Sequence, residues 1–176
     1  MKINIGPIIG DHLRSLRNEN DQSRSYIDYF IFFVIPILCG VYSYRENFRL
    51  DRESYNASIT FFGIFVALLL NIQMAIFSIY QRKWNRDLES IYVDNDRADV
   101  EIRRRLLEQL NSNISYLIIV CCITLVLVLS SYIRSTSNLV VAALTVVLYA
   151  HFILTMLMVV KRSHSLFQRE YQETDS

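Results

Sequence analysis

The residues that could do chemistry at membrane depth are few, and the first of them is His151. It lies in an apolar run, 139–160, with Thr155 one helical turn away on the same face. An imidazole titrates near neutral pH, so His151 could serve a proton relay or a gate. The alternative is a neutral imidazole held by an amide or a carbonyl, because a polar group in this setting needs a partner. The sequence leaves both interpretations open.

The sequence contains no set of residues suited to binding a metal or to nucleophilic catalysis. His151 is the one histidine within the apolar runs, and Cys121 and Cys122 are neighbours that would point about 100° apart on a helix. The four glycines form no phosphate-binding loop, and the chain has no HExxH pattern and no carboxylate pair at membrane depth. The sequence therefore predicts a protein that is not an enzyme, with no catalytic residue, no metal site and no cofactor.

Four positions form what we call the small-residue seam, with one amide among small side chains at every fourth residue: Gly63, Ala67, Asn71 and Ala75. Such spacing lets another helix approach closely. Gln73 lies about 200° around the helix from Asn71, so the two amides face different neighbours, one inside the chain and the other in a second subunit. Packing within a single chain is the alternative. Asn71 lies at a depth similar to that of His151, so the two could meet.

These residues are positioned by four apolar runs, 26–44, 56–80, 114–133 and 139–160, in a chain that is 52% hydrophobic. Each run is near the roughly 20 residues that a helix needs to cross a bilayer. Alternation with period two is absent, so helices rather than barrel strands satisfy the backbone. Pro36 predicts a kink in the first run, with a released carbonyl near Phe32. We expect an all-α integral membrane protein with a four-helix transmembrane bundle.

The distribution of basic residues predicts the orientation of these spans. Of the 18 Lys and Arg residues, 14 lie in the N-terminal segment, the loop between the second and third spans, and the C-terminal tail. The other two loops hold the remaining 4. Because basic residues are retained on the cytoplasmic side, the sequence predicts a multi-pass protein with both termini in the cytoplasm.

Three segments would then lie in the cytoplasm: residues 1–25, 81–113 and 161–176. Residues 81–113 predict a helical hairpin between the second and third spans, with helices 82–92 and 98–113 and a turn at 94–96. Its candidate docking residues for a cytosolic partner are Arg97, Arg103, Arg104 and Arg105. A solvated connector is the alternative. The hairpin has as many acidic as basic residues, so direct nucleic-acid binding is not expected.

The N-terminal segment contains a short amphipathic pattern. Ile9, Leu13 and Leu16 recur at helical spacing, with charged residues on the other faces. Such a helix could lie on the lipids of the inner leaflet or pack under the bundle, and the sequence does not choose between these placements.

Two stretches, together with four spans in a chain of this length, resemble a known family. Residues 106–116 read LLEQLNSNISY, and residues 151–162 read HFILTMLMVVKR. They resemble the KwaA family, the membrane subunits of the Kiwa anti-phage defence system. The resemblance implies a homo-oligomeric sensor or platform in the bacterial inner membrane that recruits a cytosolic DNA-binding effector like KwaB. It implies no catalytic residue.

Two functions remain as alternatives. The protein is either a scaffold that recruits a soluble effector or itself an oligomeric pore that depolarises the cell. A pore lines its axis with polar side chains along a whole helix, whereas residues 125–129 and 139–144 offer almost none. This favours the scaffold.

Overall fold

Every element of the described chain is helical. The computed structural model describes residues 5–15, 30–89, 97–134 and 138–174, and their side chains except at 15, 79–103, 165–167 and 169–174. The elements, in chain order, are α1 (Gly6–Ser15), the π-helical turn η1 (Phe30–Val34), α3 (Ile35–Arg45), α4 (Arg52–Glu89), α5 (Arg97–Arg134) and α6 (Leu139–Thr174). The predicted all-α class is confirmed.

Three of these helices are long and apolar enough to cross a membrane. The qualifying segments are Arg52–Ser78, Arg104–Arg134 and Leu139–His164, which contain the second, third and fourth predicted spans apart from residues 79–80. The first predicted span is represented by the shorter apolar helix Phe30–Arg45. Residues 26–29 of that span lie outside the described residues, as does the predicted turn at 94–96.

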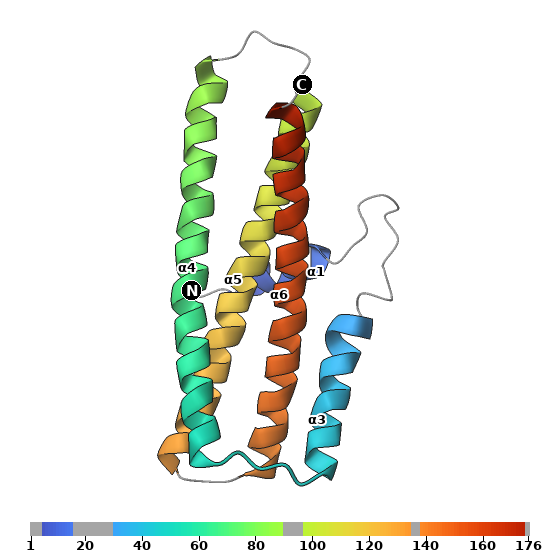
Figure 1. Ribbon diagram of the computed structural model, residues 1–176, viewed down its shortest axis with the longest axis vertical. Helices are drawn as coiled ribbons and strands as arrows, with labels where there is room; N and C mark the ends of the chain where they lie inside the picture. Colours follow the sequence, from blue (N-terminus) through green and yellow to red (C-terminus); the bar gives the residue numbers. More distant parts are fainter. Residues whose placement is uncertain (1–4, 16–29, 90–96, 135–137, 175–176) are drawn as a thin grey trace.

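The long helices stand side by side, with α3 against the lower half of α6 (Figure 1). We call the end that carries residues 46–51 the lower end, and the end that carries Glu89 and Arg97 the upper end. The second predicted hairpin helix runs straight into the third predicted span, as the sequence allowed, because α5 is unbroken from Arg97. The first is a continuation of α4, which extends unbroken to Glu89, and residues 90–92 lie outside the described residues. The upper end therefore consists of direct extensions of the spans.

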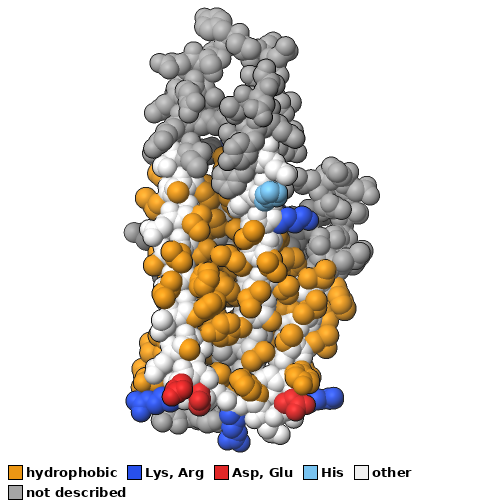
Figure 2. All heavy atoms as spheres, viewed as in Figure 1, with side chains coloured by type: hydrophobic (Ala, Val, Ile, Leu, Met, Phe, Trp, Pro, Cys, Tyr) orange, Lys and Arg blue, Asp and Glu red, His pale blue; other side chains and the backbone are white. Residues whose placement is uncertain are grey.

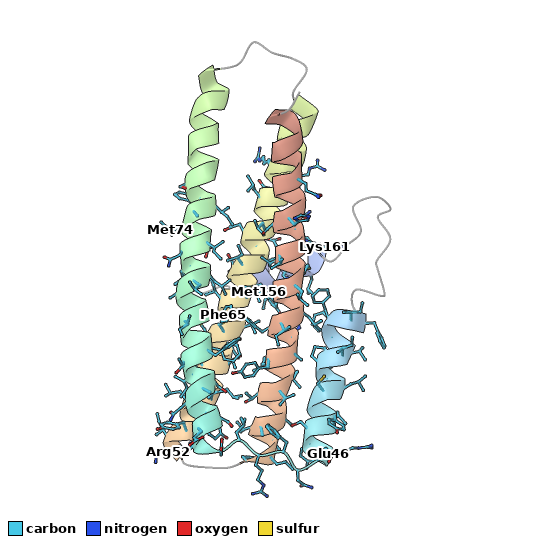
Figure 3. The ribbon with its side chains drawn as sticks, viewed as in Figure 1. Glu46, Arg52, Phe65, Met74, Met156 and Lys161 are labelled. Atoms are coloured by element: carbon cyan, nitrogen blue, oxygen red, sulfur yellow. The ribbon has the colours of Figure 1, made fainter. Side chains whose placement is uncertain are left out.

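The helices pack in the order α4, α5, α6, α3, and the described parts of α3 and α4 do not approach each other closely. Aromatic side chains fill the space between α4 and α6. The ring of Phe62 lies 4.7 Å from that of Tyr149 and 5.5 Å from that of Phe152. Phe65, labelled in Figure 3, lies 5.1 Å from Phe152. Phe62 and Phe152 are buried at the centre of the main hydrophobic core. Large rings thus hold α4 and α6 at a distance.

The crossing of α3 and α6 is close because of one glycine. A Cβ atom at Gly40 would overlap the side chain of Val147 and lie 3.1 Å from the carbonyl oxygen of Ala143. The absence of a side chain lets the two backbones meet, as small residues do at helix contacts in membranes.

Polar contacts tie the lower ends of the helices together. Asp51 precedes α4 and accepts a 2.8 Å hydrogen bond from the backbone N–H of Ser54, as an N-cap does. Hydrogen bonds from the side chain and backbone of Ser54 lower the pKa of this carboxyl group. Arg52 donates to the hydroxyl of Tyr132 at 3.3 Å, with its guanidinium carbon 5.4 Å from the ring centroid. α4 and α5 are therefore joined at this end.

The middle of the molecule presents apolar side chains outward. Figure 2 shows hydrophobic side chains over the described face of the bundle, with charged groups at its lower edge and a basic side chain beside a histidine near the upper limit of this face. Met74, Val126 and Leu157 are 65%, 67% and 60% exposed on α4, α5 and α6. A belt of this kind is what a hydrocarbon environment favours and water does not.

Candidate functional site: a buried histidine network

His151 of α6 is buried and both of its ring nitrogens have partners. Nδ1 lies 2.9 Å from the carbonyl oxygen of Phe32 in η1, and Nε2 lies 2.8 Å from the hydroxyl of Tyr116 in α5. A carbonyl only accepts, so Nδ1 carries the proton and donates it. Nε2 is then the acceptor, and Tyr116 donates to it. These bonds fix one tautomer of a neutral imidazole.

The partner carbonyl is available because of Pro36. Proline has no N–H with which to bond the carbonyl four residues before it, which is that of Phe32. The chain forms the π-helical turn η1 immediately before α3, whose first turn contains Pro36. The sequence prediction of a released carbonyl near Phe32 is confirmed by the bond from His151.

A second histidine, which the sequence analysis did not single out, joins this site. His12 of α1 is fully buried, and its Nδ1 lies 2.8 Å from Oδ1 of Asn113. Its ring stacks on Tyr116, with centroids 3.8 Å apart and planes 6° apart. We call His12, Asn113, Tyr116, His151 and the Phe32 carbonyl the histidine network. It connects α1, α5, α6 and η1.

The surroundings of His12 keep it neutral. Burial is the largest cause, and it lowers the pKa of His12 from 6.5 to about 4. The hydrogen bond to Asn113 opposes this shift, whereas electrostatic interactions with His151 and Arg162 add to it. At neutral pH the ring therefore docks uncharged on Tyr116.

The network supports a structural role for His151 better than proton transfer. Its bonds end on a backbone carbonyl, which cannot pass a proton on. Buried hydroxyls elsewhere in the spans donate to their own helices: Thr155 to the carbonyl of His151, Thr145 to Val141 and Thr124 to Val120. Thr155 thus shares a face with His151, as predicted. Within the described residues these bonds form no continuous path across the apolar belt.

The small-residue seam faces away from the rest of the chain. Gly63, Ala67, Asn71 and Ala75 are all exposed, and a Cβ at Gly63 would meet nothing within 4 Å. Gln73 faces inward and donates to the hydroxyl of Ser115 at 3.0 Å. The two amides of α4 therefore face different directions, as predicted. The inner neighbour of Gln73 is Ser115, and a second subunit beside Asn71 stays a prediction.

The expected meeting of Asn71 and His151 is wrong. Both ring nitrogens of His151 bond to other groups, and Asn71 is exposed on the outside of α4. The two side chains also lie at different depths, because Phe65, six residues before Asn71 on α4, lies 5.1 Å from Phe152, the residue after His151.

The candidate docking arginines lie on the extended part of α5. Arg104 and Arg105 are exposed, and Nε of Arg104 lies 3.0 Å from Oε1 of Glu108 one turn later. Arg97 and Arg103 also belong to α5, but their side chains lie outside the described residues. The described pair is a solvated i,i+4 contact, which is individually weak.

Comparison with known proteins identifies no relative. No family model matches the chain, no curated protein matches its sequence, and no solved structure matches its fold. Among the described residues, no group of three or more His, Cys, Asp or Glu side chains could hold a metal ion.

Proposed function

We propose that this chain is a non-enzymatic, multi-pass protein of the bacterial inner membrane that self-associates and holds a cytosolic effector protein at the membrane. One observation supports this most directly. All three long helices continue past their apolar runs at the upper end, α4 from Tyr80 to Glu89 by about 14 Å and α6 from Val160 to Thr174 by about 21 Å. The lower end has short connections instead. Such an extension is suited to binding a protein.

The proposed topology has four spans and a cytoplasmic upper end. Phe30–Arg45 would form most of the first span, because 16 residues cover about 24 Å and the apolar run begins at residue 26. The excess of basic residues at the upper end and in the N-terminal segment supports cytoplasmic termini. The extended helices would then form the cytoplasmic hairpin, 81–113, beside the start of the tail.

Self-association is supported by the small-residue seam. An amide facing lipid lacks a partner, and small neighbours allow a second helix to come close enough to supply one. Gly63, Ala67 and Asn71 meet both conditions on the exposed side of α4. A second copy of α4 packed along this seam would bring two Asn71 amides together.

The effector would dock on the cytoplasmic hairpin through Arg97, Arg103, Arg104 and Arg105. The resemblance to KwaA suggests that the effector is a DNA-binding protein like KwaB and that the pair acts in anti-phage defence. The chain itself would bind no nucleic acid, since the hairpin has balanced charge. Its own contacts are then with lipid, with copies of itself and with the effector.

Charge reversal tests this proposal. Arg103, Arg104 and Arg105 are changed together to Glu in the full chain, expressed with its neighbouring genes, and co-purifying proteins are identified. We expect the partner and phage protection to be lost while membrane insertion and oligomer size are unchanged. Reversal of Arg45 and Arg49, near the lower end, is the matched control and should keep the partner.

The pore alternative gives a different result. If the triple reversal keeps the partner and the chain expressed alone depolarises cells, recruitment by the hairpin is the wrong mechanism.

A further inference from the structure

We infer that α1 is an in-plane helix of the membrane surface, pinned to the bundle by His12 and buried in lipid along the flank that carries Ile5 and Ile9. The inference rests on the membrane placement of the three long helices in the proposed function, and it does not depend on the effector.

The height of α1 is that of a membrane boundary. His12 bonds Asn113, and the apolar run of α5 begins at the next residue, Ile114. Figure 3 places Met74, an exposed apolar residue of α4, and Lys161, an exposed cation of α6, close to the height of α1 in Figure 1. Apolar surface gives way to charge at this level, which is where interfacial helices lie.

The faces of α1 match three different environments. His12 is fully buried against α5. Ile5 and Ile9, one turn apart, are 44% and 37% exposed, and each residue advances about 100° around the helix, so both lie within about 60° of His12. Asp11 and Arg14 lie beyond this arc, with strongly exposed side chains 3.7 Å apart. One helix thus presents a protein face, an apolar flank and a charged flank.

The apolar flank of α1, with Ile5 and Ile9, is better suited to contact with lipid than to a protein interface. Two isoleucines offer far less than the roughly 800 Å² that each partner buries in a specific protein interface. The belt also presents an exposed apolar residue close to this height, Met74 of α4, which is 65% exposed. Acyl chains are present at this level without any association step, whereas a protein partner would need a larger surface.

A pair of single-tryptophan chains tests the inference. In a full-length Trp84→Phe background, Ile9→Trp reports on the apolar flank and Arg14→Trp on the charged flank. Each is reconstituted in phosphatidylcholine–phosphatidylglycerol vesicles whose lipids carry bromine at positions 6 and 7 of one acyl chain. We expect the brominated lipid to quench Ile9→Trp at least two-fold more than Arg14→Trp, and aqueous acrylamide to quench them in the reverse order.

Three outcomes would overturn the inference. Equal quenching of the two variants would mean that α1 has no lipid flank, stronger acrylamide quenching of Ile9→Trp would place that flank in water, and protection of Ile9→Trp from both quenchers would place it against protein. If Ile9→Trp loses the oligomer size of the parent chain, Ile5→Trp takes its place. None of these readouts involves the effector, so a failed recruitment test leaves them unchanged.

Discussion

Gly40 and Gly63 are the same residue in opposite settings. At Gly40 an added Cβ would overlap Val147, because α3 and α6 meet there, while at Gly63 it would meet nothing. The amides of α4 repeat this contrast, since Gln73 donates to Ser115 and Asn71 is exposed. Small and polar residues in these helices therefore have two uses. One set, which includes Gly40 and Gln73, makes contacts within the chain, and the other, which includes Gly63 and Asn71, is exposed.

Substitution of the two glycines should give the largest difference between the residues packed within the chain and the exposed residues. Gly40→Leu should destabilise the chain by about 3 kcal/mol or more, because the new side chain overlaps Val147 and the Ala143 carbonyl. Gly63→Leu should leave the stability of the monomer unchanged and shift the detergent-solubilised protein to smaller species. Unfolding in mild detergent and size-exclusion chromatography measure the two effects. An unchanged oligomer in a folded Gly63→Leu variant would remove the seam from the interface.

Acid should weaken the docking of α1 on α5 through His12. The pKa of His12 is about 4 when docked and 6.5 ordinarily, so docking is at full strength above pH 6.5 and weakens as the pH falls toward 4. At about 1.4 kcal/mol for each pH unit, the total loss is roughly 3 kcal/mol. His151 and Arg162 of α6 are the charged or titratable groups that act on this ring, with Asn113 and Tyr116 of α5 against it.

Mobility of a spin label at Arg14→Cys, in a chain without other cysteines, measures this undocking. The label should become more mobile between pH 6.5 and 4. His12→Gln should remove the pH dependence, and the same titration curve in that variant would assign the transition to another group.

A smaller effect should distinguish the inner and outer polar groups. Tyr116→Phe removes the hydroxyl that donates to Nε2 of buried His151, and we expect it to cost about 1 to 2 kcal/mol. Asn71→Leu is the outer counterpart, and it should leave the monomer as stable as before while weakening self-association. Comparison of both variants by reversible unfolding and by oligomer size checks the contrast. Equal loss of monomer stability in the two would contradict it.

The smallest effect should come from the exposed ion pair of α5. Arg104 and Glu108 are both more than half exposed, so Arg104→Ala should change stability by less than about 0.5 kcal/mol. Partner binding should also change little with this single substitution. A large loss on either measure would show that Arg104 makes contacts beyond Glu108.

The sequence predicted features that depend on the geometry of one helix. The divergence of Asn71 and Gln73 follows from 100° per residue, and the available carbonyl of Phe32 follows from the missing N–H of Pro36. The apolar runs predicted the three long helices because burial in lipid demands length and hydrophobicity.

Features that depend on how helices are rotated and ordered were not predictable in the same way. His12 and Asn113 are 101 residues apart in the sequence, and nothing local pairs them. The failed pairing of Asn71 with His151 has the same origin, since counting residues from the end of an apolar run fixes neither the height nor the rotation of one helix against another. A signal for His12 was nevertheless present, because it lies on the same arc of α1 as Ile5, Ile8 and Ile9.

The unbroken length of α4, α5 and α6 has a mechanical consequence. Both prolines of the chain lie outside these helices, so no proline kink absorbs bending between the lower end and the upper end. Each helix then acts as a stiff lever. A tilt of about 10° about the lower end would move the tip of a 38-residue helix such as α4 by about 10 Å. A small tilt at the end that carries the Arg52–Tyr132 contact would thus become a displacement of several ångströms at the upper end.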